Sequence, residues 1–184
     1  DYTLTDFGNN ISMVVTDPTD PMNTVAQTTK PLGAELWAGT TMGTADGFAN
    51  AIPFTATETQ ITVRVWSPDA GIPVRVKVED ATNPTISVET EDTTTVAAAW
   101  ETLTFDFTNE VMGTAALNLD NTYDKASIFF NFGTTGDDAG EKTYYWDDVE
   151  FVGGDPVLEQ IDLPVTFEED NVDYTLTDFG NNIS

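Results

Sequence analysis

The chain has 184 residues, of which 32 are acidic and only 6 are basic, so its formal net charge at pH 7 is -26. Such a surface repels DNA, RNA and anionic lipid, because proteins bind these by neutralising phosphates with Lys and Arg. No apolar run reaches the ~20 residues of a membrane-spanning helix. The chain also lacks cysteine and histidine, which excludes disulfides and the commonest general base and transition-metal ligand. Hydrophobic residues make up 40%, enough for the core of one domain of this length.

Twelve residues at the start of the chain recur unchanged at its end. Asp1–Ser12 and Asp173–Ser184 both read DYTLTDFGNNIS. The period from Asp1 to Asp173 is 172 residues, which is too long for a solenoid repeat or a propeller blade and has the length of a whole domain. We therefore expect the chain to be one period of a tandem array, with a short overlap into the next copy.

Between these ends, five segments alternate apolar and polar residues with the period of two that β-strands require, and turn residues separate them. In chain order they are Ile61–Trp66, Pro73–Glu79, Leu103–Phe107, Ser127–Phe132 and Tyr144–Phe151. The turn SPDAGI joins the first two segments, and we expect it to form a hairpin. No segment shows the spacing of apolar residues every three to four positions that an amphipathic helix requires. Alternation with one buried face predicts an all-β, two-sheet antiparallel β-sandwich.

The order of these motifs resembles a known family. The motifs are FEE at Phe167–Glu169, WAG at Trp37–Gly39, ITVRVWSPDAGIPVRVKVED, WETLTFDF, KASIFFNFG and YYWDDVEF. Over nearly the whole chain this order is similar to that of the galactose-binding-like jelly-roll modules. These occur as carbohydrate-binding modules of polysaccharide-degrading enzymes and in large surface proteins, notably of marine Bacteroidota. The resemblance implies a jelly roll, a secreted or cell-surface location and a glycan as partner, although jelly rolls host many functions.

The C-terminal part predicts a junction between repeats. Val152–Asp162 carries Gly-Gly, Pro and acids, which is typical of a linker. The strand LPVTFEE follows at Leu163–Glu169. We therefore expect residues 1–151 to form a jelly-roll module that lacks its own first strand, and 163–184 to form that strand and the start of the next repeat. The strand either returns to pair with Tyr144–Phe151 or fills the vacant slot of a neighbouring chain, and we expect the neighbour.

The resemblance also implies a structural calcium ion between the first and last strands, with Glu168 and Asp147 at the matching positions. Alternation places Asp147 on one face with Val149 and Phe151, and we expect it to point inward. A buried carboxylate needs a partner, and a calcium ion with oxygen ligands supplies one in a chain with so few basic residues. The alternative is that Asp147 lies at a strand rim, where water or backbone amides satisfy it.

Modules of this kind stack sugar rings on exposed aromatic side chains. Trp66 and Arg64 face outward on one strand and Lys77 faces outward on the next, which predicts a sugar platform on the hairpin. Trp37 and Tyr123, in loops or at strand ends, would add walls. The alternative is that Trp66 covers a sheet edge while the basic side chains pair with nearby acids. Because of the charge of -26, we expect a bound glycan to be neutral.

We do not expect an enzyme. Glycosidases need two carboxylates, but an acidic chain offers such pairs everywhere, so their presence carries no signal. The expected function is that of a non-catalytic tandem-repeat module in a bacterial adhesin or filament, binding a neutral glycan with a structural calcium ion. The alternative is a purely structural spacer that polymerises head-to-tail by strand donation and binds no ligand.

Overall fold

The computed structural model describes residues 3–153, 159–160 and 172–173. By its contacts the chain divides into two compact units, Asp1–Val152 and Gly153–Ser184. In the second unit, β11 (Glu159–Gln160) and β12 (Val172–Asp173) pair in parallel. The predicted strand Leu163–Glu169 lies outside the described residues, and so does nearly all of the second copy of the repeated motif, so the predicted junction stays a prediction.

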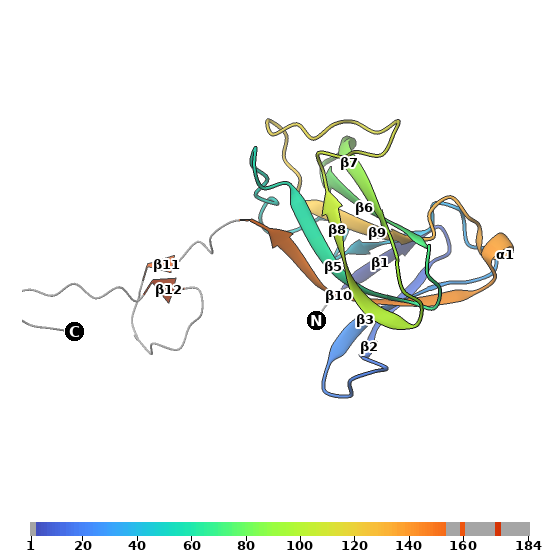
Figure 1. Cartoon of the computed structure of the whole chain (residues 1–184). Coiled ribbons are helices and arrows are strands. Elements are labelled where there is room, and N and C mark those ends of the chain that lie inside the picture. Colours follow the sequence, from blue (N-terminus) through green and yellow to red (C-terminus); the bar gives the residue numbers. More distant parts are fainter. Residues whose placement is uncertain (1–2, 154–158, 161–171, 174–184) are drawn as a thin grey trace, which may run out of the picture. The chain divides into compact units, whose positions relative to one another are not determined.

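The first unit is a sandwich of two five-stranded sheets, each antiparallel throughout, which confirms the predicted fold class (Figure 1). Sheet A contains, from edge to edge, β1 (Leu4–Phe7), β4 (Gly39–Met42), β9 (Lys125–Phe130), β6 (Pro73–Asp80) and β7 (Asn83–Thr93). Sheet B contains β2 (Ile11–Thr16), β3 (Thr24–Lys30), β10 (Lys142–Val152), β5 (Gln60–Ser67) and β8 (Ala99–Asp106). The helical content of the described residues is α1 (Gly136–Ala139), and none of their helices could cross a membrane.

The core lies between the sheets and follows the predicted alternation. Val63 and Val65 of β5 and Val74, Val76 and Val78 of β6 are all fully buried. The polar residues between them, such as Arg64, Arg75 and Lys77, point outward and stay partly exposed, as a sheet with one buried face requires. The aromatic side chains that complete the core are Phe105, Phe107, Phe130, Tyr144 and Trp146.

The segment between β5 and β6 is a crossover and not the predicted hairpin. β5 lies in sheet B and β6 in sheet A, and the two strands do not pair. The apolar pattern suits both arrangements equally, because Val63 and Val74 are buried whether the chain turns back in one sheet or passes to the other. The consequence is that outward side chains of β5 and β6 lie on opposite outer faces of the sandwich.

The expected inward orientation of Asp147 is wrong. Tyr144 and Trp146 of β10 are buried, 0% and 5% exposed, so Asp147 shares the outer face with Tyr145. The register between β10 and β5 shifts between Asp147 and Glu150, and Asp148 has a φ of 46°. This bulge reverses the alternation, since one extra residue moves every later side chain to the other face. Phe151 follows the bulge and Asp147 precedes it, so the two side chains lie on different faces although they are four residues apart.

Lys30, at the end of β3, is a buried cation that forms no ion pair with any carboxylate in the described part of the chain. It is 1% exposed, and its Nζ donates hydrogen bonds to the carbonyl oxygens of Phe130 and Asn131, at 3.3 and 3.0 Å. Burial disfavours the charged amine and lowers the pKa of Lys30 from 10.5 to about 8. The folded state therefore holds the Lys30 proton less tightly than the unfolded chain does.

This difference predicts that the domain gains stability as the pH rises above neutrality. Between about pH 8 and 10.5 the unfolded chain keeps a proton that the folded chain has lost, so the free energy of unfolding increases with pH. The gain is at most about 3 kcal/mol. Urea unfolding between pH 7 and 9.5 measures it, and Lys30→Met is the control. Equal slopes for the variant and the wild type would contradict the assignment to Lys30.

Candidate functional site

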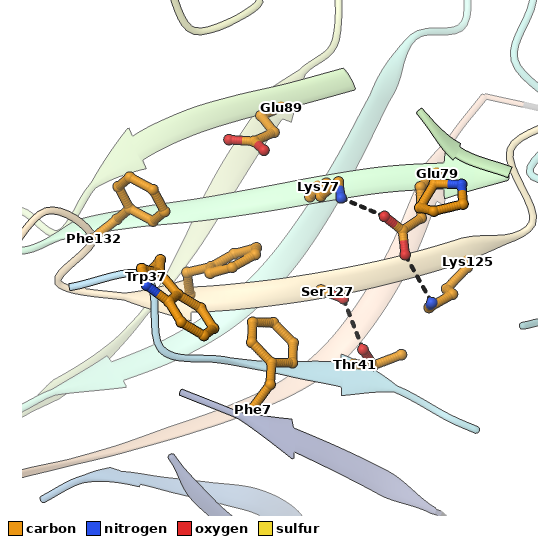
Figure 2. Close-up of a pocket in the computed structure, with 11 residues that line it drawn as sticks. Phe7, Trp37, Thr41, Lys77, Glu79, Glu89, Lys125, Ser127 and Phe132 are labelled. Atoms are coloured by element: carbon orange, nitrogen blue, oxygen red, sulfur yellow. Dashed lines mark hydrogen bonds and ion pairs between the residues drawn. The ribbon is translucent and has the colours of Figure 1, made fainter. Parts of the chain in front are cut away.

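A groove crosses the outer face of sheet A and holds a cavity of about 460 Å³. Strands β1, β4, β9, β6 and β7 form its floor, because alternate residues of each strand point out of the sheet. We call it the sheet A groove. Figure 2 shows aromatic side chains gathered at one end and charged side chains at the other. Its lining consists of Phe7, Trp37, Thr41, Lys77, Glu79, Pro84, Glu89, Lys125, Ser127, Phe129 and Phe132.

The aromatic end is a continuous cluster of four rings. Phe7 stacks on Trp37 at a centroid distance of 6.2 Å and meets the edge of Phe129 at 5.5 Å, and Phe132 meets Phe129 at 5.6 Å. Phe129 is 6% exposed beneath its neighbours, whereas Trp37 is 47% exposed. Trp37 therefore offers the most open aromatic surface in the groove.

Gly39 makes this cluster possible. A Cβ atom at this position would lie 2.6 Å from Cδ1 of Phe129 and 2.8 Å from Cζ of Phe7. Both rings thus lie directly against the backbone of β4. Phe7 is the residue of β1 that pairs with Gly39 across the two strands. The WAG motif supplies both the exposed ring, Trp37, and the bare backbone on which its neighbours pack.

The polar end is organised by Glu79, which is 6% exposed and forms ion pairs with both Lys77 and Lys125. Burial opposes ionisation of Glu79, but the hydrogen bonds and charges of the two lysines outweigh it and lower the pKa of the carboxyl below its ordinary value. Beside them the hydroxyls of Thr41 and Ser127 share a hydrogen bond of 2.9 Å. This end presents ammonium groups, a carboxylate and hydroxyls within one short stretch of sheet (Figure 2).

Arg75 closes the rim of the groove at the aromatic end. Its guanidinium lies 3.6 Å from the centroid of Phe132 and pairs with Glu89 at 2.9 Å and Glu91 at 3.1 Å. A guanidinium stacked on a ring and held by two carboxylates has little rotational freedom. Arg75 therefore fixes Phe132 at one wall of the groove.

The structure brings together two of the five residues predicted for glycan binding. Trp37 and Lys77 both line the sheet A groove, at opposite ends. Sequence reasoning missed the three phenylalanines Phe7, Phe129 and Phe132. Phe129 and Phe132 lie in the predicted strand Ser127–Phe132, in which alternation puts Phe132 on the same face as Ile128 and Phe130. The available signal was Phe129, which must face outward if Ile128 and Phe130 face inward.

Trp66 and Arg64 lie on the opposite outer face, on sheet B. Arg64 is 4.1 Å from the Trp100 ring centroid and within 3.7 Å of Asp17 and 3.8 Å of Asp147. Trp66 packs edge-on against Tyr145 at 5.4 Å. The predicted platform of Trp66, Arg64 and Lys77 is therefore not assembled, because β5 and β6 belong to different sheets.

Tyr123 does not wall a surface site. It is 3% exposed and packs edge-on against Phe54 in the core, at a centroid distance of 5.9 Å. Its hydroxyl accepts hydrogen bonds from the Asn118 amide and from Nδ2 of Asn121, at 3.2 and 3.4 Å. The tyrosine thereby secures the loop that leads into β9.

Of the two predicted calcium ligands, the structure describes the surroundings of Asp147 alone. Asp147 accepts a hydrogen bond of 2.9 Å from Nδ2 of Asn23 and lies 3.8 Å from the Arg64 guanidinium, so protein groups compensate its charge. Within residues 3–153, 159–160 and 172–173, no three acidic side chains gather as metal ligands would. Glu168, the other predicted ligand, lies outside the described residues.

The sandwich is similar to known carbohydrate-binding modules. The family 11 carbohydrate-binding module of a cellulosomal cellulase of Clostridium thermocellum superposes with a TM-score of 0.50 at 14% identity, over 83% of this chain and 88% of that one. The same module has been solved with a β-1,3-1,4-mixed-linked tetrasaccharide, again with a TM-score of 0.50 at 14% identity. A module of the β-sandwich superfamily described as promiscuous in specificity gives 0.51 at 16% identity, over 83% of this chain and 57% of that one. No family model and no curated protein matches the sequence.

Proposed function

We propose that this chain is a non-catalytic carbohydrate-binding module that holds a neutral glycan in the sheet A groove. The observation that carries the proposal is the combination of a half-exposed Trp37 with hydroxyl, ammonium and carboxylate groups along one groove. Sugar rings have apolar C–H faces and polar edges. A ring stacked on Trp37 places its neighbours along the groove, where polar side chains can exchange hydrogen bonds with sugar hydroxyls.

The charge of the groove supports a neutral ligand. The ammonium groups of Lys77 and Lys125 face the carboxylate of Glu79, and the Arg75 guanidinium faces Glu89 and Glu91. Each of these three basic side chains already forms an ion pair, and the chain as a whole carries a charge of -26. A sulfated or uronate polymer would be repelled over the whole approach.

Isothermal titration with β-1,3-1,4-mixed-linked glucan and other neutral oligosaccharides, beside a sulfated and a uronate polymer, tests this function. We expect binding to neutral glycans alone, and weak binding because one exposed ring dominates the groove. Absence of binding to every neutral glycan on a broad array would contradict the proposal. So would a preference for the anionic polymers.

The calcium prediction now depends on Glu168 and is tested in the same preparations. A cation bound only by the folded state raises stability, by about 2.7 kcal/mol at a concentration one hundred times its dissociation constant. Calorimetry with calcium and with chelator is expected to show a higher melting temperature with calcium. Equal melting temperatures would contradict the calcium site and leave the glycan proposal untouched.

A second candidate function is that of a spacer repeat in a secreted or cell-surface bacterial adhesin or filament. The identical twelve-residue ends favour it, because duplication of whole domains lengthens such a protein directly. The two functions are compatible, since linked copies of a weak glycan site gain avidity. A chain that fails to bind any glycan while it associates with its own copies would leave the spacer as the function.

A further inference from the structure

One edge of β10 is covered by a neighbouring strand along only half of its length. On the β5 side, β10 is paired from Tyr145 to Val152. On the β3 side, the pairing starts at Lys142 and ends at Trp146, opposite Ala26. Among the described residues, the stretch from Asp147 to Val152 therefore has no strand partner on the β3 side. An uncovered edge of this kind is a template for an added strand.

A second groove lies at this uncovered edge and holds a cavity of about 990 Å³. We call it the edge groove, and its apolar lining includes Leu4, Val25, Met42, Phe48, Trp146 and Val149. Leu4 and Met42 belong to sheet A, and Val25 and Trp146 to sheet B, so the groove opens into the core between the sheets. Exposed apolar side chains surround it, with Met22 at 91% and Val149 at 40%. The sandwich therefore exposes an apolar surface at this edge that a further strand could bury.

We infer that the edge groove accepts Leu163–Glu169 of a second copy of this chain as an added strand. In extended conformation this segment, LPVTFEE, would place Leu163, Val165 and Phe167 on one face, which suits the apolar lining. At ~3.3 Å per residue its seven residues are long enough to cover the open stretch of β10, Asp147–Val152. Pro164, which lacks an N–H group, stands near the start of the strand, where it costs least.

The repeat indicates why this segment suits the edge groove. Leu163–Val172 stands directly ahead of the second DYTLTDFGNNIS, and the first copy of that motif enters β1 at Leu4. Thr3 and Leu4 line the edge groove. In the repeat, the segment LPVTFEE comes shortly before the motif that forms β1. A donor strand seated in the edge groove would therefore end beside the start of β1, as this order requires. Donation from each chain to the next does not close on itself and yields open filaments.

Charge variants on the two sides of the contact test this inference in the full chain. Phe167→Asp puts a charge on the apolar face of the donor strand. Val149→Asp puts a charge in the edge groove, and the variant should fold because Val149 is already exposed. Met112→Asp, at a side chain 97% exposed and outside the groove, is the matched control. Light scattering of the wild type and the control is expected to show masses that rise with concentration above the 20.0 kDa of one chain. Each of the two variants alone is expected to stay at that mass.

Mixing the two variants separates donation between chains from return within one chain. The Val149→Asp chain keeps its donor and the Phe167→Asp chain keeps its acceptor, so a one-to-one mixture is expected to form two-chain complexes and to stop there. A wild type that stays at 20.0 kDa up to the highest concentration overturns the inference. Variants that polymerise like the wild type, or a mixture that stays monomeric, overturn it as well.

Discussion

Replacing Trp37 with alanine is expected to weaken glycan binding about thirty-fold, which corresponds to about 2 kcal/mol for the loss of a central aromatic contact. The side chain is 47% exposed and its main partner is the ring of Phe7, so the variant should fold. For a weak parent affinity this loss removes the heat signal entirely. Isothermal titration with the neutral glycan that the wild type binds is the measurement, and circular dichroism checks the fold.

Trp66→Ala is the matched control for this experiment. Trp66 is also a partly exposed tryptophan, but it lies on the outer face of sheet B and packs against Tyr145. The variant should keep the wild-type affinity if the glycan occupies the sheet A groove. Loss of binding in Trp66→Ala with retention in Trp37→Ala would move the site to the sheet B face, as the sequence alone suggested.

Replacing Gly136 with alanine is expected to destabilise the domain by about 3 kcal/mol, the upper part of the range for overpacked sites. A Cβ atom at Gly136 would lie 1.8 Å from the carbonyl oxygen of Pro31 and 3.0 Å from the amide nitrogen of Ala34. Both neighbours are backbone atoms, which cannot rotate away. For a domain of about 150 residues this corresponds to a fall in melting temperature of about 10 °C.

The segment around Gly136 also holds the loop that carries Trp37. The Gly136 amide donates to the carbonyl of Ala34 at 2.9 Å, and the Gly133 amide donates to that of Leu36, also at 2.9 Å. Gly133→Ala is the control, because Gly133 has a φ of 86° but open space around its Cβ position. We expect it to cost only about 1 kcal/mol, for the left-handed backbone. Equal losses of stability in the two variants would show that the clash at Gly136 is relieved.

The sequence by itself determined the fold class and the inner faces of the best strands. In β5, β6 and β8, strict alternation identifies Val63, Val76 and Phe105 as core residues, and all three are fully buried. This works because a strand with one buried face has only one way to place an alternating pattern. The motif WAG and the outward Lys77 were also visible in the sequence, although nothing there showed that they share a groove.

Tertiary structure alone decided which outward side chains meet. A hairpin and a crossover bury the same valines of β5 and β6, so alternation could not reveal that Trp66 and Lys77 lie on opposite faces of the sandwich. The bulge after Asp147 reversed the alternation within one strand, which no periodic pattern records. The groove itself joins Phe7, Trp37 and Phe129 from distant parts of the chain, because β1, β4 and β9 are neighbours in sheet A, and strand order follows from long-range packing and not from local sequence.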